Sequence, residues 1–279
     1  MLRGILIFAI KHPYYGRYAY NLAVTIKAVE DIPIAVVYDD SSMNHLSGDQ
    51  LKVFDKRIHA PESIQKNCGA KLWAYEMTPF EHTLVLDADM LWLPKKKPSE
   101  LLDILEGSPF TAITEGCTDH PTSHYFFWAE VDEIRAKYGV DKIYQWRTEV
   151  MYFEKCTKAK KLFDDARAIH ANPNLKVKTF AEGIPDELAI NIAAAIGDIH
   201  PHADRWQPSY WPQLFQNRVP EPATLYRDYY LLSVGGNHTT ENVKLFYNRL
   251  VKAQAPKIGQ GHCFPVQSKH SFLTERRKS

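Results

Sequence analysis

One run of residues constrains this chain more than any other, because it places two carboxylates inside an apolar segment. The run covers residues 83–93 and reads TLVLDADMLWL. A short apolar run of this kind predicts a buried strand. Charges are rarely left unpaired in such an element, so the two aspartates need a cation. Side chains alternate along a strand, which puts Asp87 and Asp89 on one face and Ala88 on the other.

The chemistry of this pair favours a divalent metal ion. Two hard oxygen ligands side by side suit Mg²⁺ or Mn²⁺, which keep positions open for water and for substrate phosphates. The alternative is that Asp87 and Asp89 only cap a turn at the end of a strand. The apolar residues on both sides of the pair favour the metal site over this alternative.

The N-terminal part of the chain predicts an open α/β sheet. Residues 5–10, ILIFAI, form an apolar run that suits a parallel strand covered on both faces. A helix is expected over residues 18–29 and a second strand over residues 34–38. Strand, helix and strand in this order imply a right-handed crossover. Ligands bind beyond the carboxyl ends of such strands, so we expect residues 9–15 and the Asp87 region at one edge.

The segment before the two aspartates carries a family resemblance. Residues 71–80, KLWAYEMTPF, predict a short amphipathic helix that ends at Pro79. A Lys-Leu pair, a short helix and a strand that closes in Asp-Ala-Asp together resemble the glycogenin-like family 8 of the GT-A glycosyltransferases. In that family the lysine stands as far ahead of the first aspartate as Lys71 stands ahead of Asp87.

The resemblance implies a fold and a domain organisation. We expect a single GT-A domain, a Rossmann-like open mixed sheet flanked by helices, over residues 1–265. Residues 266–279 are expected to be a basic, polar and loosely held tail.

The resemblance also implies a site for a UDP-sugar donor. Tyr15 falls where the family places a tyrosine over the uracil ring, and an aromatic face can stack on a base. The alternative for Tyr15 is a rim tyrosine that packs on the helix. Residues 10–13, Ile-Lys-His-Pro, stand where the family has Thr-Asn-Asp. The donor-binding residues implied are Ala9, Lys11, His12, Tyr15, Lys71, Asp87 and Ala88.

Two further segments resemble motifs of the same family. Residues 184–191, IPDELAIN, resemble its Asp-Gln-x-x-x-Asn motif and imply that Asp186 acts with Lys71 in catalysis. Proline before Asp186 suits a helix start, where acidic residues complement the dipole, and a plain helix start is the alternative. At residues 147–149, Arg-Thr-Glu replaces the family's Asn-Ser-Gly.

The family completes its metal site with a histidine on a late strand. A direct overlay places that histidine near Ser233, which cannot be an equivalent ligand. The expected ligands for Mn²⁺ or Mg²⁺ are therefore Asp87, Asp89 and His238, with His262 as the second candidate for the histidine.

Composition and net charge limit the classes of protein to which this chain can belong. The net charge is +1 over 279 residues, which removes a general electrostatic argument for a nucleic-acid partner. The four cysteines form no CxxC pair and predict free thiols in a reducing compartment. The apolar run at residues 4–10 is too short to span a membrane. We therefore expect a cytoplasmic protein without a transmembrane segment.

Taken together, the residues and the resemblance predict a metal-dependent hexosyl- or pentosyltransferase that uses a UDP-sugar and retains the anomeric configuration. The acceptor stays open among a glycan, a protein, a lipid-linked glycan and a modified nucleic acid. One alternative is a nucleotidyltransferase, which ordinarily has a glycine-rich phosphate loop that residues 11–16 lack. The other is a non-catalytic nucleotide-sugar-binding protein on the same fold.

Overall fold

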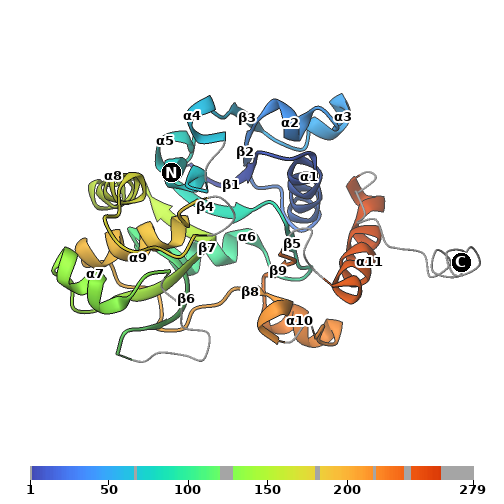
Figure 1. Ribbon diagram of the computed structural model, residues 1–279. Helices are drawn as coiled ribbons and strands as arrows, with labels where there is room; N and C mark the ends of the chain where they lie inside the picture. The colour runs from blue at the N-terminus through green and yellow to red at the C-terminus, as the bar shows by residue number, and fades with distance from the viewer. Residues whose placement is uncertain are drawn as a thin grey trace, which may run out of the picture.

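A computed structural model of the chain describes residues 2–65, 68–119, 128–179, 183–215, 218–235 and 240–258. The tail expected over residues 266–279 lies outside them. Within the described residues the strands form two sheets (Figure 1). The larger has the order β3-β2-β1-β4-β7-β6, and the smaller has the order β5-β9-β8.

The N-terminal elements alternate between strands of the large sheet and helices. In chain order they are β1 (Arg3–Ala9), α1 (Pro13–Lys27), β2 (Ile34–Tyr38), α2 (Asp40–Met43), α3 (Gly48–Leu51), β3 (Lys56–His59) and α4 (Glu62–Gln65). Strand β1 pairs in parallel with β2, and β2 pairs in parallel with β3. The predicted crossover is therefore present, although α1 begins five residues before the predicted helix because Pro13 suits the first helical turn.

The central elements supply the remaining strands of the large sheet, the first strand of the small sheet and helices on both faces of the large sheet. They are η1 (Ala70–Trp73), α5 (Ala74–Met77), β4 (His82–Asp87), β5 (Met90–Trp92), α6 (Pro98–Leu105), β6 (Phe110–Cys117), α7 (Val131–Tyr138), β7 (Tyr144–Glu154), α8 (Thr157–Ala171) and α9 (Asp186–Ile196). Strand β4 pairs in parallel with β1, whereas β7 runs antiparallel to both β4 and β6. The sheet is therefore mixed, as the sequence predicts.

The C-terminal elements are β8 (Ser209–Tyr210), η2 (Pro212–Phe215), α10 (Pro222–Asp228), β9 (Leu231–Ser233) and α11 (Glu241–Ile258). Strand β9 pairs antiparallel with β5 and parallel with β8, which builds the small sheet. None of the described helices is long and apolar enough to cross a bilayer.

The predicted single strand over residues 83–93 is wrong in one respect. Strand β4 ends at Asp87, a turn follows at Ala88 and Asp89, and β5 belongs to the small sheet. Met90 leaves the β4 ladder because it pairs with Ser233 of β9 instead. The two aspartates therefore stand at the junction between the sheets, and strand alternation does not set their directions.

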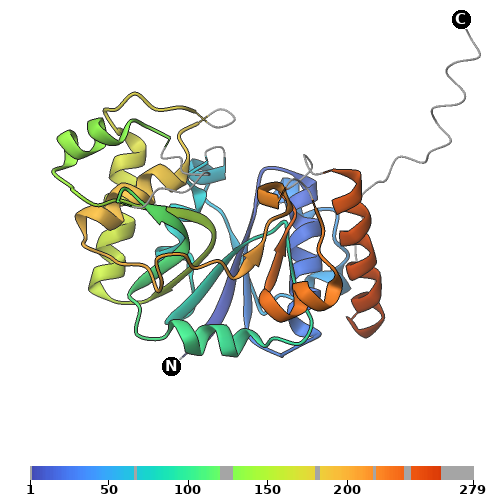
Figure 2. The same cartoon turned by 90° about the horizontal axis from the view of Figure 1, so that it is seen from below.

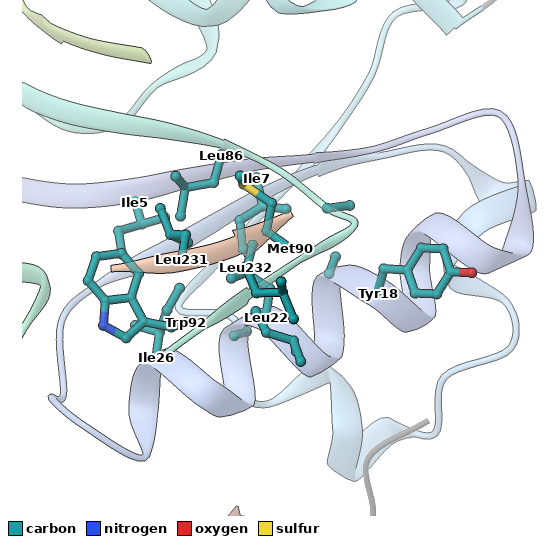
Figure 3. Packing of buried hydrophobic residues seen from close by; sticks show 14 of the residues in the cluster. Ile5, Ile7, Tyr18, Leu22, Ile26, Leu86, Met90, Trp92, Leu231 and Leu232 are labelled. Carbon is teal, nitrogen blue, oxygen red and sulfur yellow. The ribbon is translucent and has the colours of Figure 1, made fainter. Parts of the chain in front are cut away.

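Both faces of the large sheet are buried. Along β1, Ile5 and Ile7 belong to the core on the α1 side, while Leu6 and Phe8 belong to the core on the α8 and α9 side. Figure 2 shows α1 and α11 on one side of the sheet and α8 and α9 on the other. Figure 3 shows β1, α1, β5 and β9 packed together, with Trp92 fully buried. This double coverage explains why the central strands are apolar without alternation.

A close approach between α1 and α2 generates a prediction about stability. A methyl group at Gly16 would lie 2.0 Å from the backbone oxygen of Ser42. We expect Gly16→Ala to destabilise the protein by about 1–3 kcal/mol, because an added carbon in a packed contact forces the backbone apart. Urea unfolding followed by circular dichroism measures this change.

The matched control is Gly48→Ala in α3, where an added methyl group has no neighbour within 4 Å. This variant should unfold close to the wild type. Equal unfolding midpoints for both variants would contradict the close approach of the two helices.

Candidate active site

Four elements meet around the ammonium group of Lys71, at the carboxyl end of β4. Lys71 Nζ donates to Asp87 Oδ1 at 2.9 Å, and to Thr148 Oγ1 and O at 2.9 and 3.1 Å. It also lies 3.5 Å from Asp186 Oδ2 at the start of α9. The structure thus brings together three residues that the sequence analysis selected, Lys71, Asp87 and Asp186, and adds Thr148 of β7.

Lys71 is held in its charged form by its partners. Burial disfavours an ammonium ion, but Asp186 and Asp87 outweigh it and raise the pKa of Lys71 above its ordinary value. The side chain is 16% exposed, so its charge is directed mainly at these carboxylates.

The two aspartates carry more negative charge than Lys71 can neutralise. Burial raises the pKa of Asp87, and Lys71 opposes part of this rise. Burial, followed by repulsion from Asp87 and Glu149, raises the pKa of Asp89 to about 7. Among the described residues no side chain donates a hydrogen bond to the Asp89 carboxylate. Such a pair of oxygen donors fits a Mg²⁺ or Mn²⁺ ion, which would supply the missing positive charge.

The third expected ligand is not part of this geometry. His238 and His262 both lie outside the described residues. Within the described ranges, no three His, Cys, Asp or Glu side chains are grouped as a metal site. Ser233, where the family overlay places a histidine, ends β9, and its Oγ lies 3.5 Å from Glu149 Oε2.

Strand β7 departs from its neighbour β6 beside this site. Ala112 of β6 pairs with Met151, yet the next residue, Ile113, pairs with Arg147. Residues 148–150 therefore bulge out of the β6 ladder. A bulge frees backbone groups and redirects side chains, which explains how the Thr148 carbonyl accepts from Lys71.

A buried ion network flanks the bulge. Arg147 Nη1 donates to Glu115 Oε1 at 2.6 Å, and Arg147 Nη2 pairs with Glu149 Oε1. The guanidinium group lies 4.4 Å from the ring of Trp211, and Arg147 is only 6% exposed. Ser209 Oγ of β8 donates to Glu149 at 3.0 Å. The network therefore joins β6 and β7 to the small sheet.

In the sequence, Arg147, Thr148 and Glu149 stand out only as departures from a family motif. One signal for their pairing is present in the sequence, because an arginine and a glutamate two residues apart on a strand share a face. Their buried partner Glu115 has no such signal, because it lies 32 residues away in the chain.

The turn between β1 and α1 contains two of the expected donor-binding residues. Lys11 has a φ of 78°, a left-handed conformation that is uncommon outside glycine, and its N–H donates to Asp39 Oδ2 at 2.6 Å. His12 caps α1 by accepting a hydrogen bond at Nδ1 from the Tyr14 N–H at 3.2 Å. Ala9 ends β1 opposite Tyr38. The turn is thus held by hydrogen bonds from backbone N–H groups to side chains, and it follows β1, whose Phe8 pairs with Asp87.

Tyr15 lies in the first turn of α1, near enough to the aspartates for their charges to act on it. Burial raises the pKa of Tyr15 to about 12, and the charges of Asp89 and Asp87 contribute to the rise. Its side chain nevertheless keeps surface for a ligand, because the residue is 38% exposed. Ala88, between the aspartates, is 2% exposed, so the residue offers almost no surface to a donor.

The start of α9 is fixed by two contacts with β7. Thr148 Oγ1 donates to Asp186 Oδ2 at 3.1 Å, and the Trp146 N–H donates to Asn191 Oδ1 at 2.9 Å. The asparagine of the Asp-x-x-x-x-Asn segment therefore attaches the helix to the strand. Between them, Glu187 accepts a hydrogen bond from Trp128 Nε1 at 2.8 Å, and burial followed by Asp186 raises the pKa of Glu187 to about 7.

Comparison with known proteins identifies the fold. No protein-family model matches the chain, and no curated protein matches its sequence. The chain is similar to the bifunctional glycosyltransferase WbbM in its apo form, with a TM-score of 0.52 and 12% identity over 85% of this chain. It spans only 46% of WbbM.

A second solved structure matches along nearly the whole chain. It is the galactosyltransferase LgtC in complex with donor and acceptor sugar analogs, with a TM-score of 0.56 and 14% identity. The similarity covers 96% of this chain and 99% of LgtC. These likenesses confirm the predicted GT-A fold.

The ion network at β7 yields a prediction about stability. Arg147→Met leaves Glu115 and Glu149 buried without their cation, which is expected to cost about 3–5 kcal/mol of unfolding free energy. Urea unfolding at pH 7 measures the loss. Arg227→Met is the control, because the Arg227–Asp228 pair is exposed and should contribute little. Similar unfolding midpoints for the two variants would show that the buried network does not contribute to stability.

Glu187 predicts a dependence of stability on pH. The unfolded carboxyl titrates at about 4.5, whereas the folded one titrates at about 7. As pH rises between these values the unfolded chain releases its proton first, so this residue lowers stability over that window. Glu187→Gln should therefore lose less stability than the wild type between pH 5 and pH 8. Glu133→Gln, exposed on α7, is the control and should follow the wild type.

Proposed function

We propose that this protein is a metal-dependent glycosyltransferase that transfers a hexosyl or pentosyl group from a UDP-sugar to an acceptor, with retention of configuration. The observation that carries the proposal is the cluster of Lys71, Asp87, Thr148 and Asp186 at the carboxyl end of β4. Ligands of open α/β sheets bind at this edge. The LgtC structure, solved with donor and acceptor sugar analogs, supports a donor and an acceptor for this fold.

The proposed donor lies across the junction of the two sheets. Tyr15 would stack on the uracil ring, and the turn at Ala9, Lys11 and His12 would surround the nucleoside. Asp87 and Asp89, with His238 as the third candidate, would hold Mn²⁺ or Mg²⁺. When bound, this ion would neutralise the charge of the diphosphate leaving group. The carboxylates cannot do so by themselves, because they are negatively charged as well.

Asp186 is the carboxylate that we assign to the sugar. Its Oδ2 accepts from Thr148, and its Oδ1 accepts from the Glu187 N–H at 3.0 Å. A carboxylate fixed in this way can accept a hydrogen bond from a sugar hydroxyl and stabilise positive charge at the anomeric carbon. The acceptor hydroxyl would pass its proton to a diphosphate oxygen on the same face, which leads to retention. Lys71, together with the metal ion, would steady the diphosphate as it leaves.

The metal and donor assignments make one prediction. A nucleotide at a hundred times its dissociation constant stabilises the native state by about 2.7 kcal/mol. We expect UDP with Mn²⁺ to raise the melting temperature, and GDP or ADP with Mn²⁺ to raise it less. Asp89→Asn should abolish the shift, because it removes an expected metal ligand while no described side chain loses a partner. Differential scanning fluorimetry measures both effects.

The control for this prediction is Asp49→Asn in α3, whose carboxylate pairs with Lys52 at the surface. It should keep the full shift. A shift with GDP alone would reject the uridine assignment, and an unchanged shift in Asp89→Asn would reject the metal assignment.

Stereochemistry provides a separate prediction. Retention follows from attack on the face from which the diphosphate leaves, with a diphosphate oxygen as the base for the acceptor hydroxyl. A screen of UDP-sugars in the presence of Mn²⁺ first identifies the donor by its slow hydrolysis. Proton NMR of the fresh product should then show the anomeric coupling of the donor. An inverted product would reject this mechanism.

A further inference from the structure

We infer that Thr148 is a positioning residue that fixes the Lys71 ammonium and the Asp186 carboxylate relative to each other, an inference that rests on the proposed sugar transfer. Thr148 does not face the solvent, since it is 2% exposed. Its hydroxyl is within hydrogen-bond distance of both groups, at 2.9 Å from Lys71 Nζ and 3.1 Å from Asp186 Oδ2.

The chemistry of the three groups sets the direction of these hydrogen bonds. An ammonium group can only donate, and a hydroxyl has one proton to give. The Thr148 hydroxyl must therefore accept from Lys71, which leaves its own proton for Asp186. Because Lys71 cannot accept, the hydroxyl has one consistent orientation, and Asp186 Oδ2 must act as the acceptor.

The hydroxyl also bridges Lys71 and Asp186. The direct distance from Lys71 Nζ to Asp186 Oδ2 is 3.5 Å, compared with 2.9 Å to Asp87 Oδ1. Without the hydroxyl, Lys71 would keep its shorter contact with Asp87 and Asp186 would lose a donor. Hydrogen bonds that involve an ionised partner are the stronger ones, so this loss would alter the geometry of both groups.

Two features of the fold hold Thr148 in place. The first is a second hydrogen bond from Lys71, which the Thr148 carbonyl can accept because the bulge at residues 148–150 releases it from the β6 ladder. The neighbouring residues Arg147 and Glu149 are fixed by the buried ion network. A β-branched side chain on such a backbone has few alternative rotamers, so the hydroxyl is aimed before any substrate binds.

The test compares Thr148→Val, which keeps the shape and removes the hydroxyl, with Thr148→Ser, which keeps the hydroxyl. Misplaced catalytic groups cost about a hundredfold in rate, so kcat for UDP-sugar turnover should fall by about that factor in the valine variant. Its KM for the donor should change little, and the serine variant should retain most of the wild-type kcat. Thr83→Val is the matched control, because Thr83 is buried in β4 and bonds to Thr78.

A double variant separates positioning from a general structural role. If Thr148 acts through Asp186, then Thr148→Val should cause no further loss of kcat in an Asp186→Asn background. Melting temperatures show whether each variant is folded. A folded valine variant with wild-type kcat, or a full additional loss in the double variant, would overturn the inference alone. A wild-type protein that turns over no nucleotide sugar would reject the proposed function and this inference with it.

Discussion

The structure depends on how negative charge is neutralised at one edge of a buried sheet. Asp87, Asp89 and Glu149 stand at the junction of the two sheets, and Asp186 approaches from α9. Buried carboxylates are costly without a cation or a hydrogen-bond donor. Lys71 supplies that cation for two of them. The meeting of η1, β4, β7 and α9 is therefore an electrostatic requirement as much as a matter of packing.

The Arg147 network serves a different purpose from the Lys71 cluster. A buried ion network is a weak source of stability, because desolvation cancels most of the attraction. Its value here is in its connections: Glu149 reaches Ser209 and Ser233, which belong to the small sheet. The small sheet is therefore attached to the site twice, through β5, which follows Asp89 directly and pairs with β9, and through the contacts of Glu149. The network thus connects Arg147 and Glu149, two of the residues that differ from the family motif, to the geometry of the candidate site.

Side-chain alternation and the bulge in β7 together let these two groups of residues share one strand. Alternation places Thr148 on the face opposite Arg147 and Glu149. A regular ladder would leave the Thr148 carbonyl paired with β6, whereas release of residues 148–150 from β6 lets this carbonyl accept from Lys71. Irregular backbone beside a site is common in enzymes for this reason. Loss of regular pairing is compensated by the contacts that β7 keeps with β4.

The sequence by itself determined the features that depend on near neighbours. Apolar runs predicted the central strands, Pro185 and Asp186 marked the start of α9, and the Asp-Ala-Asp run pointed to the carboxyl end of β4 as a candidate site. Tertiary structure decided the rest, since the Lys71–Thr148 contact joins residues 77 apart and the Thr148–Asp186 contact joins residues 38 apart. The break after Asp87 also lay beyond local patterns, because an apolar run reads the same whether its second half stays in one sheet or pairs with β9 in another.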